Sequence, residues 1–320
     1  MNAAPDFALI GAAKAGTTQL AGWLALHPGI YLSPVKEPHF FGREFDPARF
    51  SDAYRRQHPP LPADYFSQLP LAPVHLAFVR DSAQYTQLFA SAEPHQLRGE
   101  CSTGYFFSTT AAAEWSAIRP DARAVALLRD PRDRALSHYS MALRYGYVQG
   151  SFAEEWKADA RRSPKGWGRS ENFFELGCYA DAVERWWSAL GPDQLLLVDF
   201  ADLRDFPLET YNRVLCHLGL APVDAVPEAE QFAARTPRFP RVNRWLHASG
   251  TAHAARRLFP STWFRSLKNK WLAPGKPTLP ADVRAALRAA YLPDQQRLQA
   301  LLAEKGLRLR SVDAFLLENE

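Results

Sequence analysis

The sequence has few cysteines: three in 320 residues, at Cys101, Cys178 and Cys216. They are widely spaced, and no two of them form a CxxC motif. This pattern argues against a disulfide framework and a structural zinc site, and it fits thiols that stay reduced in a cytosol. Clusters of His, Cys and carboxylate residues at ligand spacing are also lacking, so we expect no metal site. Internal repeats are lacking as well.

Long apolar runs are absent too. No stretch reaches the roughly 18 apolar residues that a transmembrane helix needs. The first residues, MNAAPDFALIG, place no basic segment before their short apolar run, unlike a signal peptide. We therefore expect a soluble, cytoplasmic protein. The net charge of +4 suits an anionic ligand, but it is too small and too dispersed to indicate nucleic-acid binding.

The most informative stretch is FALIGAAKAGTTQLAGWLALH, near the N-terminus. Phe7–Ile10 has the length and polarity of a buried strand. Gly11–Gly16 then forms a loop of small residues around Lys14, and Thr17 and Thr18 open a helix. Backbone N–H groups at a helix start lack intrahelical partners, and the helix dipole adds positive charge there. The layout therefore predicts a site for a phosphate or sulfate group.

This loop differs from the GxxxxGK[ST] pattern of ATP- and GTP-binding P-loops. Lys14 precedes Gly16, and no lysine stands directly before the threonine pair. The lysine would therefore reach an anion from the loop, not from the first turn of the helix. The alternative interpretation is an ordinary strand–helix turn with a surface lysine.

A second basic stretch follows another apolar strand, Ala124–Leu128. The sequence RDPRDRALS runs from Arg129 to Ser137, and Pro131 suits the first turn of a helix. Arginine can bind a phosphate through two parallel hydrogen bonds, and a serine hydroxyl adds a neutral donor. The alternative is a helix start stabilised by Arg–Asp salt bridges.

A third stretch, KEPHFF, contains Glu37 and His39. It lies in a predicted loop, Ser33–Phe41, which follows a predicted short strand, Ile30–Leu32. Ligands in open α/β sheets bind beyond the carboxyl ends of the strands, so this loop and the lysine loop should face one crevice. The local alternatives are that Glu37 pairs with the preceding lysine and that His39 caps the loop.

KAGTT, KEPHFF and RDPRDRALS, in this order, resemble the signatures of sulfotransferases that use PAPS (3′-phosphoadenosine 5′-phosphosulfate). The closest likeness is to bacterial members and to the sulfotransferase domains that modify heparan sulfate. It spans about residues 7–305. It implies a P-loop-kinase-like α/β fold, with a central, mostly parallel sheet flanked by helices in a single domain over residues 1–320. It also implies sulfuryl transfer from PAPS to a hydroxyl or amine acceptor, with PAP as the product.

The resemblance implies roles for individual residues. The 5′-phosphosulfate would be held by Lys14, Ala15, Gly16, Thr17 and Thr18, and the 3′-phosphate by Arg129 and Ser137. Lys14 would also stabilise the charge that develops on the leaving phosphate. Glu37 falls where heparan-type enzymes carry their catalytic base. His39 is its rival, because an imidazole has a suitable pKa.

Weaker matches extend the resemblance. The family places a tyrosine near the adenine, which would be Tyr179; a plain packing role is the alternative. Gly275 and Lys276 correspond to a loop that closes over the PAPS phosphates. Cys101, within GECSTGY, stands where many relatives have a lysine, so one cation is missing near the site. Residues 235–275 are expected to form a variable lid or acceptor wall, although their basic aromatic part would also suit a membrane surface.

Periodicity predicts the remaining elements. We expect a strand at Gln194–Phe200, helices at Phe152–Arg162, Leu208–Leu218, Ala281–Tyr291 and Asp294–Lys305, and an irregular excursion at Arg43–Pro73.

Two other function classes stay open on the sequence. A nucleotide kinase would need a metal-binding aspartate, for which Asp199 is the candidate, but its lysine order would be wrong. A catalytically silent PAP-binding scaffold is the third interpretation, and the presence of both Lys14 and Glu37 argues against it. The acceptor is not predicted: a sugar, a lipid head group, a phenolic metabolite and a peptide tyrosine all fit. The oligomeric state is not predicted either.

Overall fold

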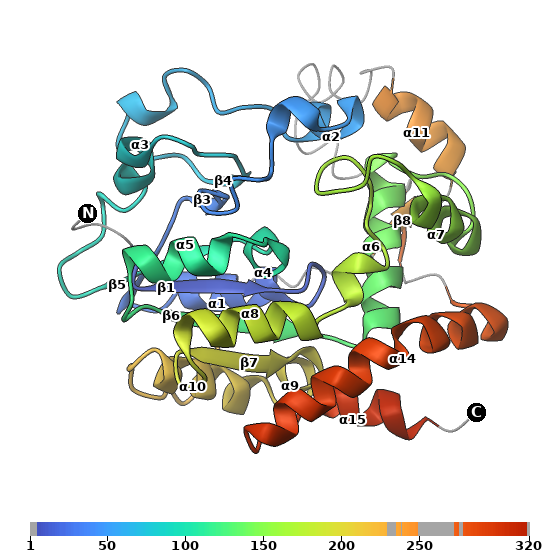
Figure 1. The fold of residues 1–320 in the computed structure, drawn as a ribbon. Helices are drawn as coiled ribbons and strands as arrows, with labels where there is room; N and C mark the ends of the chain where they lie inside the picture. The colour runs from blue at the N-terminus through green and yellow to red at the C-terminus, as the bar shows by residue number, and fades with distance from the viewer. Residues whose placement is uncertain (1–4, 229–234, 238, 249–271, 275–277, 319–320) are drawn as a thin grey trace.

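The computed structural model describes residues 5–228, 235–237, 239–248, 272–274 and 278–318. Its main sheet has five parallel strands in the order β2-β5-β1-β6-β7 (Figure 1). They are β1 (Phe7–Gly11), β2 (Ile30–Leu32), β5 (Leu97–Cys101), β6 (Arg123–Leu128) and β7 (Leu195–Asp199). The prediction of an α/β fold with a central parallel sheet is confirmed.

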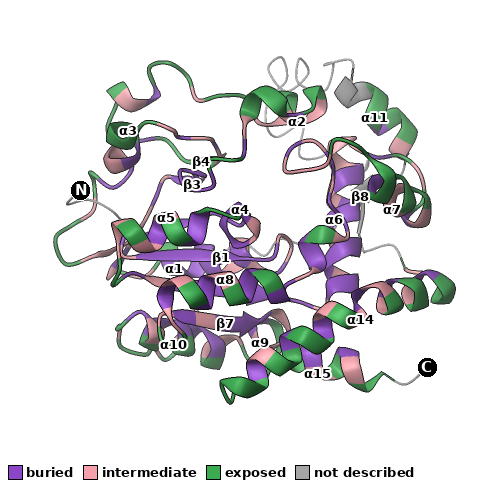
Figure 2. Ribbon diagram, in the orientation of Figure 1, coloured by how far each residue is buried: buried purple, intermediate pink, exposed green. Residues whose placement is uncertain are grey.

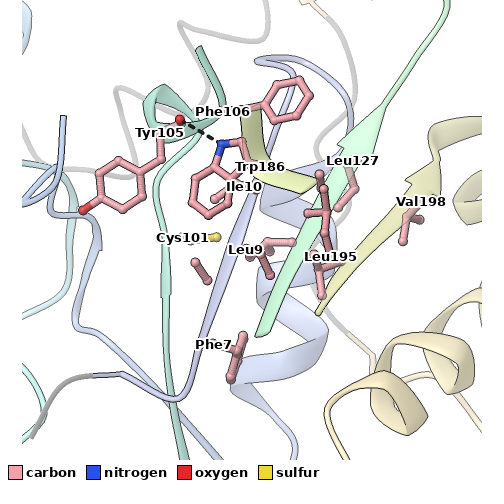
Figure 3. Packing of buried hydrophobic residues seen from close by; sticks show 14 of the residues in the cluster. Phe7, Leu9, Ile10, Cys101, Tyr105, Phe106, Leu127, Trp186, Leu195 and Val198 are labelled. Atoms are coloured by element: carbon pink, nitrogen blue, oxygen red, sulfur yellow. Dashed lines mark hydrogen bonds between the residues drawn. The ribbon is translucent and has the colours of Figure 1, made fainter. Parts of the chain in front are cut away.

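The middle strand, β1, is buried along its whole length. This is expected for a parallel strand that is covered on both faces. Phe7 pairs with Gly99 on β5 and with Arg123 on β6. A Cβ atom built on Gly99 would lie 2.2 Å from Cζ of Phe7, so the phenyl ring occupies the space that a side chain would need. Figure 3 shows Phe7 at one end of the core that these strands share.

Helices cover both faces of the sheet. The chain runs from β1 to β2 in one direction and from β5 to β6 in the other, so right-handed crossovers place the intervening helices on opposite faces. One layer contains α4 (Gly104–Phe107), α5 (Ala111–Ile118) and α8 (Ala180–Leu190). In it, Trp186 Nε1 donates to the Tyr105 carbonyl at 3.3 Å (Figure 3). The other layer contains α1 (Thr17–Ala25) and α10 (Pro207–His217), where the Tyr211 hydroxyl donates to the Trp23 carbonyl at 3.1 Å.

A second hydrophobic cluster surrounds α6 (Pro131–Tyr145), which Figure 2 shows as largely buried. The elements around it are α7 (Phe152–Arg161), α11 (Pro240–Ala248), α14 (Ala281–Glu304) and α15 (Arg310–Leu317). The remaining elements include α2 (Asp52–Gln57), α3 (Ser82–Gln87), α9 (Phe200–Asp205), a parallel pair β3 (Val35–Glu37) and β4 (Val74–Leu76), and an antiparallel pair β8 (Arg235–Pro237) and β9 (Leu272–Pro274). None of the described helices is long and apolar enough to span a membrane.

The structure corrects two of the predictions and adds one strand to the main sheet. The segment Ser33–Phe41 is not all loop, because Val35–Glu37 forms β3. The two helices predicted at Ala281–Tyr291 and Asp294–Lys305 form one helix, α14, that contains Pro293. A proline removes one helical N–H donor, but buried side chains on both sides of Pro293 keep the helix on the protein body. The strand β5 was not predicted at all.

Candidate active site

The lysine loop has a backbone that requires glycine at two positions. Gly11 and Gly16 have φ angles of +117° and +93°, and a Cβ on Gly11 would lie 2.3 Å from the Leu127 nitrogen. Lys14 also has a positive φ, 76°. Gly16 caps α1 without any side-chain hydrogen bond, so the N–H groups of the first turn have no side-chain acceptor. This is the local geometry of an anion site.

The ammonium group of Lys14 lies among other cations. Its hydrogen-bond partner among the described residues is Sδ of Met141, at 3.8 Å. Burial, followed by the charges of Arg144 and Arg129, lowers the pKa of Lys14 to about 8. A half-buried lysine beside other cations gains most from an anionic ligand.

Arg129 joins the second basic stretch to this loop. It follows β6 directly, is 6% exposed, and donates from Nη1 to the Lys14 carbonyl at 3.0 Å. Its guanidinium lies 4.5 Å from the centre of the Phe200 ring. Nε is buried and has no partner within the described chain. The side chain therefore retains a donor beside the lysine loop.

The salt-bridged helix start that was the alternative for this stretch is also present, but on other residues. The Asp130 carboxylate caps α6 by accepting from the backbone N–H groups of Arg132 and Asp133. It also accepts from the Arg132 side chain at 2.6 Å. Because these bonds occupy Asp130, Arg129 is left to face the lysine loop.

The other predicted donor-site residues lie on the same elements. Ala15 and Thr17 are buried and Thr18 is half-buried at the start of α1, and Ser137 is half-buried on α6. Tyr179 is 1% exposed, and its hydroxyl donates to the Arg129 carbonyl at 2.9 Å. This contact favours the packing role for Tyr179, because its hydroxyl is bonded to the backbone of Arg129. Gly275 and Lys276, and most of the predicted region 235–275, lie outside the described residues.

Glu37 ends β3 and is 6% exposed. Its Oε1 accepts from Nζ of Lys36 at 2.9 Å, and its Oε2 accepts from the Thr103 hydroxyl at 2.8 Å. Burial raises the pKa of this carboxyl, but the opposing charges of Lys36 and His39 outweigh it and hold the pKa at about 2. The pairing with Lys36 that the sequence offered as an alternative is therefore present, and Glu37 is ionised at neutral pH.

His39 is enclosed by aromatic rings. It is 0% exposed, stacks on Phe78 with centroids 4.9 Å apart, and lies 5.6 Å from the centre of the Trp167 ring. Nδ1 lies 3.1 Å from the Glu37 carbonyl, whereas Nε2 has no hydrogen-bond partner among the described residues and lies 3.8 Å from Oε2 of Glu37. Burial lowers the pKa of His39 to about 4. By pKa alone the imidazole is the stronger base of the two, but its ring is fully enclosed, whereas Glu37 keeps 6% exposure.

Sequence reasoning missed Thr103 and His75. Thr103 lies inside the GECSTGY segment, but its contact with Glu37 depends on how β5 and β3 lie in space. The pairing of Val35 with Val74 places His75 beside Lys36. His75 is exposed as a whole. Desolvation of its imidazole by neighbouring groups lowers the pKa, and the negative charge of Glu37 acts in the opposite direction. No sequence signal identifies this strand pairing.

Asp199, the candidate metal ligand of a nucleotide kinase, is bound to the backbone. Asp199 is 0% exposed, and its two oxygens accept from the N–H groups of Ala201, at 2.8 Å, and Ser311, at 2.6 Å. Both carboxylate oxygens of Asp199 therefore accept hydrogen bonds from backbone N–H groups. Among the described residues, no group of three or more His, Cys, Asp or Glu side chains is placed to hold a metal. Cys101 is buried, which raises the pKa of its thiol to about 12.

The parallel sheet and the anion loop at its edge define a P-loop-like α/β protein. A family model described as the sulfotransferase family matches residues 5–224, so the chain belongs to that family. Human bifunctional heparan sulfate N-deacetylase/N-sulfotransferase 3 is 29% identical over 231 residues, which cover 71% of this chain and 24% of the relative. Mouse heparan sulfate glucosamine 3-O-sulfotransferase 3B1 is 25% identical over 289 residues, which cover 90% of this chain and 61% of the relative.

A solved structure agrees with these relatives. The sulfotransferase from Alicyclobacillus acidocaldarius superposes with a TM-score of 0.69 and 25% identity, over 97% of this chain and 99% of the other. By contrast, the chain spans less than two thirds of the two curated relatives named above.

Proposed function

We propose that this protein is a PAPS-dependent sulfotransferase that transfers the sulfuryl group to a hydroxyl or amine of a carbohydrate, lipid or secondary metabolite. The contact between Arg129 and the Lys14 carbonyl carries the proposal, because it places cations from the ends of β1 and β6 at one edge of the sheet. PAPS is an anion at two points, its 5′-phosphosulfate and its 3′-phosphate. Family membership supports the same reaction.

The described residues fit such a donor. Lys14 and the uncapped N–H groups at Gly16, Thr17 and Thr18 would hold the phosphosulfate. The 3′-phosphate would lie on Arg129, whose Nε has no partner among the described residues, and on the hydroxyl of Ser137. Gly275 and Lys276 stay a prediction for a loop that covers these phosphates.

When bound, PAPS supplies the sulfuryl group. Glu37 accepts the proton that the acceptor hydroxyl or amine loses as its oxygen or nitrogen bonds to sulfur. Lys14 donates to the oxygen that separates from sulfur and stays on PAP, and so stabilises the negative charge that develops there. A carboxylate with a pKa of about 2 is a weak base. Lys36 holds that pKa down, so a weaker contact between Lys36 and Glu37 would raise the pKa and strengthen the base.

Calorimetric titration with PAP, ATP and AMP in EDTA tests the proposal. PAP should bind most tightly, because it alone of the three carries both a 3′-phosphate and a 5′-phosphate. EDTA should have no effect, since no step uses a metal. Preference for ATP, or binding that EDTA abolishes, would favour a nucleotide kinase. Tight PAP binding without sulfuryl transfer to any acceptor in a broad screen would favour the silent scaffold.

A further inference from the structure

The carboxyl group of Glu100 lies buried on β5 with 1% exposure, and its hydrogen-bond partners in the described part of the chain lie outside the lysine loop. Its Oε1 accepts from the hydroxyls of Tyr85 and Tyr105, the latter at 3.2 Å. Its Oε2 accepts from the Ser102 hydroxyl at 2.8 Å. Burial raises the pKa of this carboxyl to about 7, with the charge of Glu37 acting in the same direction. Such a group is costly to bury, so its presence calls for an explanation.

The partners of Glu100 hold the segment that carries Glu37. The Ser102 hydroxyl accepts from the N–H of His39 at 3.3 Å, and the Tyr105 hydroxyl accepts from the N–H of Phe41 at 3.2 Å. Two alternate residues of one chain segment, 39 and 41, are therefore held through their backbone. The carboxylate at residue 37 is held directly by the Thr103 hydroxyl.

Glu100 sets the direction of both hydroxyls. In its ionised form Glu100 only accepts, so Ser102 and Tyr105 donate their protons to the carboxylate, and their lone pairs are free to accept from the backbone of residues 39 and 41. A glutamine at position 100 would present an NH₂ group to one of these hydroxyls. That hydroxyl would then receive two donors, and its own proton would lose its acceptor.

We propose that Glu100 is a positioning residue for sulfuryl transfer, acting through Ser102 and Tyr105 on the backbone of residues 37–41 and thereby on the Glu37 carboxylate. This inference rests on the proposed role of Glu37 as the base. In this proposal the GECSTGY segment fixes the position of the C-terminal end of β3 and of the residues that follow it, through hydrogen bonds to Glu37, His39 and Phe41.

The test compares Glu100→Gln and Ser102→Ala with a matched control, Glu44→Gln. Glu44 also accepts from several donors, including the Ser108 hydroxyl at 2.6 Å and the Thr109 N–H at 2.8 Å, but these bonds do not reach residues 37–41. Three quantities are measured: hydrogen exchange of the amides in residues 37–41, PAP affinity, and transfer from radiolabelled PAPS to heparosan and to p-nitrophenol as probe acceptors.

We expect faster exchange at the amide of residue 39 in both test variants and at the amide of residue 41 in Glu100→Gln. In both variants kcat should fall about tenfold, which corresponds to about 1.4 kcal/mol. PAP affinity should stay within about twofold. The double variant should lose no more than the worse single variant, because both changes break one chain of bonds. Glu44→Gln should alter neither the exchange of residues 37–41 nor kcat.

Unchanged exchange at residues 39 and 41 would overturn the inference, and this readout needs no acceptor. Unchanged kcat in Glu100→Gln and Ser102→Ala would also overturn it, provided that Glu37→Gln lowers kcat in the same assay. If Glu37→Gln itself turns over normally, the proposed function of Glu37 fails instead. Should Glu100→Gln fail to fold, Ser102→Ala, which removes a single hydroxyl, decides the matter.

Discussion

Nη1 of Arg129 lies 3.0 Å from the carbonyl oxygen of Lys14, a residue 115 positions earlier in the chain. The contact exists because β1 and β6 are neighbours in the sheet, so the segments after their carboxyl ends meet. Since β1 continues into α1 towards β2 and β6 lies on the opposite side, this edge is a point where the strand order reverses. It is the usual position of ligand sites in such sheets.

Replacing Arg129 with methionine should weaken binding of PAP by about 10- to 100-fold, as loss of a charge-assisted hydrogen bond does. Adenosine 5′-phosphosulfate, which has no 3′-phosphate, should lose much less affinity. Calorimetry with the two nucleotides measures the difference. An equal loss for both would mean that Arg129 acts by supporting the Lys14 loop and not by binding the 3′-phosphate.

Replacing Lys14 with methionine should lower turnover by about 10²-fold and, at the same time, stabilise the fold. The pKa of Lys14 is lowered to about 8 in the folded chain, so folding carries a cost below pH 8 that disappears as the pH rises towards 10.5. Removing the charge should therefore gain about 1–3 kcal/mol at pH 7. Urea unfolding at pH 7 and pH 10 tests this. A variant that is less stable than the parent at pH 7 would refute the electrostatic account.

The kcat/KM for PAPS should fall as the pH rises above about 8, because the free enzyme then loses the Lys14 proton. The fall of kcat above this pH should be smaller, since bound PAPS is a polyanion and stabilises the protonated form of Lys14. In Lys14→Arg, the guanidinium stays charged, so any remaining activity should not fall at alkaline pH. An alkaline fall that persists in Lys14→Arg would mean that a group other than Lys14 titrates.

Glu37→Gln should leave PAP affinity within about twofold and lower kcat by about 10²-fold or more, the range for loss of a general base. Thr103→Ser, which keeps a hydroxyl beside the carboxylate, is the matched control and should retain most of the activity. If PAP binding is lost in Glu37→Gln while turnover at saturation is preserved, Glu37 is a structural residue.

Tyr179→Phe separates the two interpretations of this tyrosine. Its buried hydroxyl donates to the Arg129 carbonyl, so we expect a loss of about 1 kcal/mol in the free energy of unfolding. PAP affinity should change by less than about threefold. A much larger drop in PAP affinity, with unchanged stability, would restore the adenine contact that the family resemblance implies.

The parts of the site that could be predicted from sequence are those encoded locally. Phe7–Gly11 and Ala124–Leu128 are apolar runs, and the glycines of the lysine loop adopt conformations that only glycine favours. The positions of Lys14, Arg129 and Glu37 follow from such runs and from the rule on strand ends.

The missed parts depend on long-range partners. The strand β5 contains Arg98 and Glu100, which break the apolar pattern. Arg98 forms an ion pair with Asp6, and Glu100 accepts a hydrogen bond from Tyr85. These partners lie far away in the sequence, so the polar side chains gain them only in the folded chain. In the same way, Thr103 and His75 acquire their places near Glu37 only when β3, β4 and β5 assemble.

The glycine at position 99 has a consequence for how the two substrates meet. The Phe7 ring fills the space beside it, and β1 pairs with β5 at this position. The chain after Phe7 leads to the donor lysine, and the chain after Gly99 leads to the residues that hold Glu37. Gly99 therefore lies between the segment that carries Lys14 and the segment that contacts Glu37, at a point where no side chain fits. A larger residue at position 99 would displace the Phe7 ring or separate β5 from β1, and so would shift these two segments relative to each other.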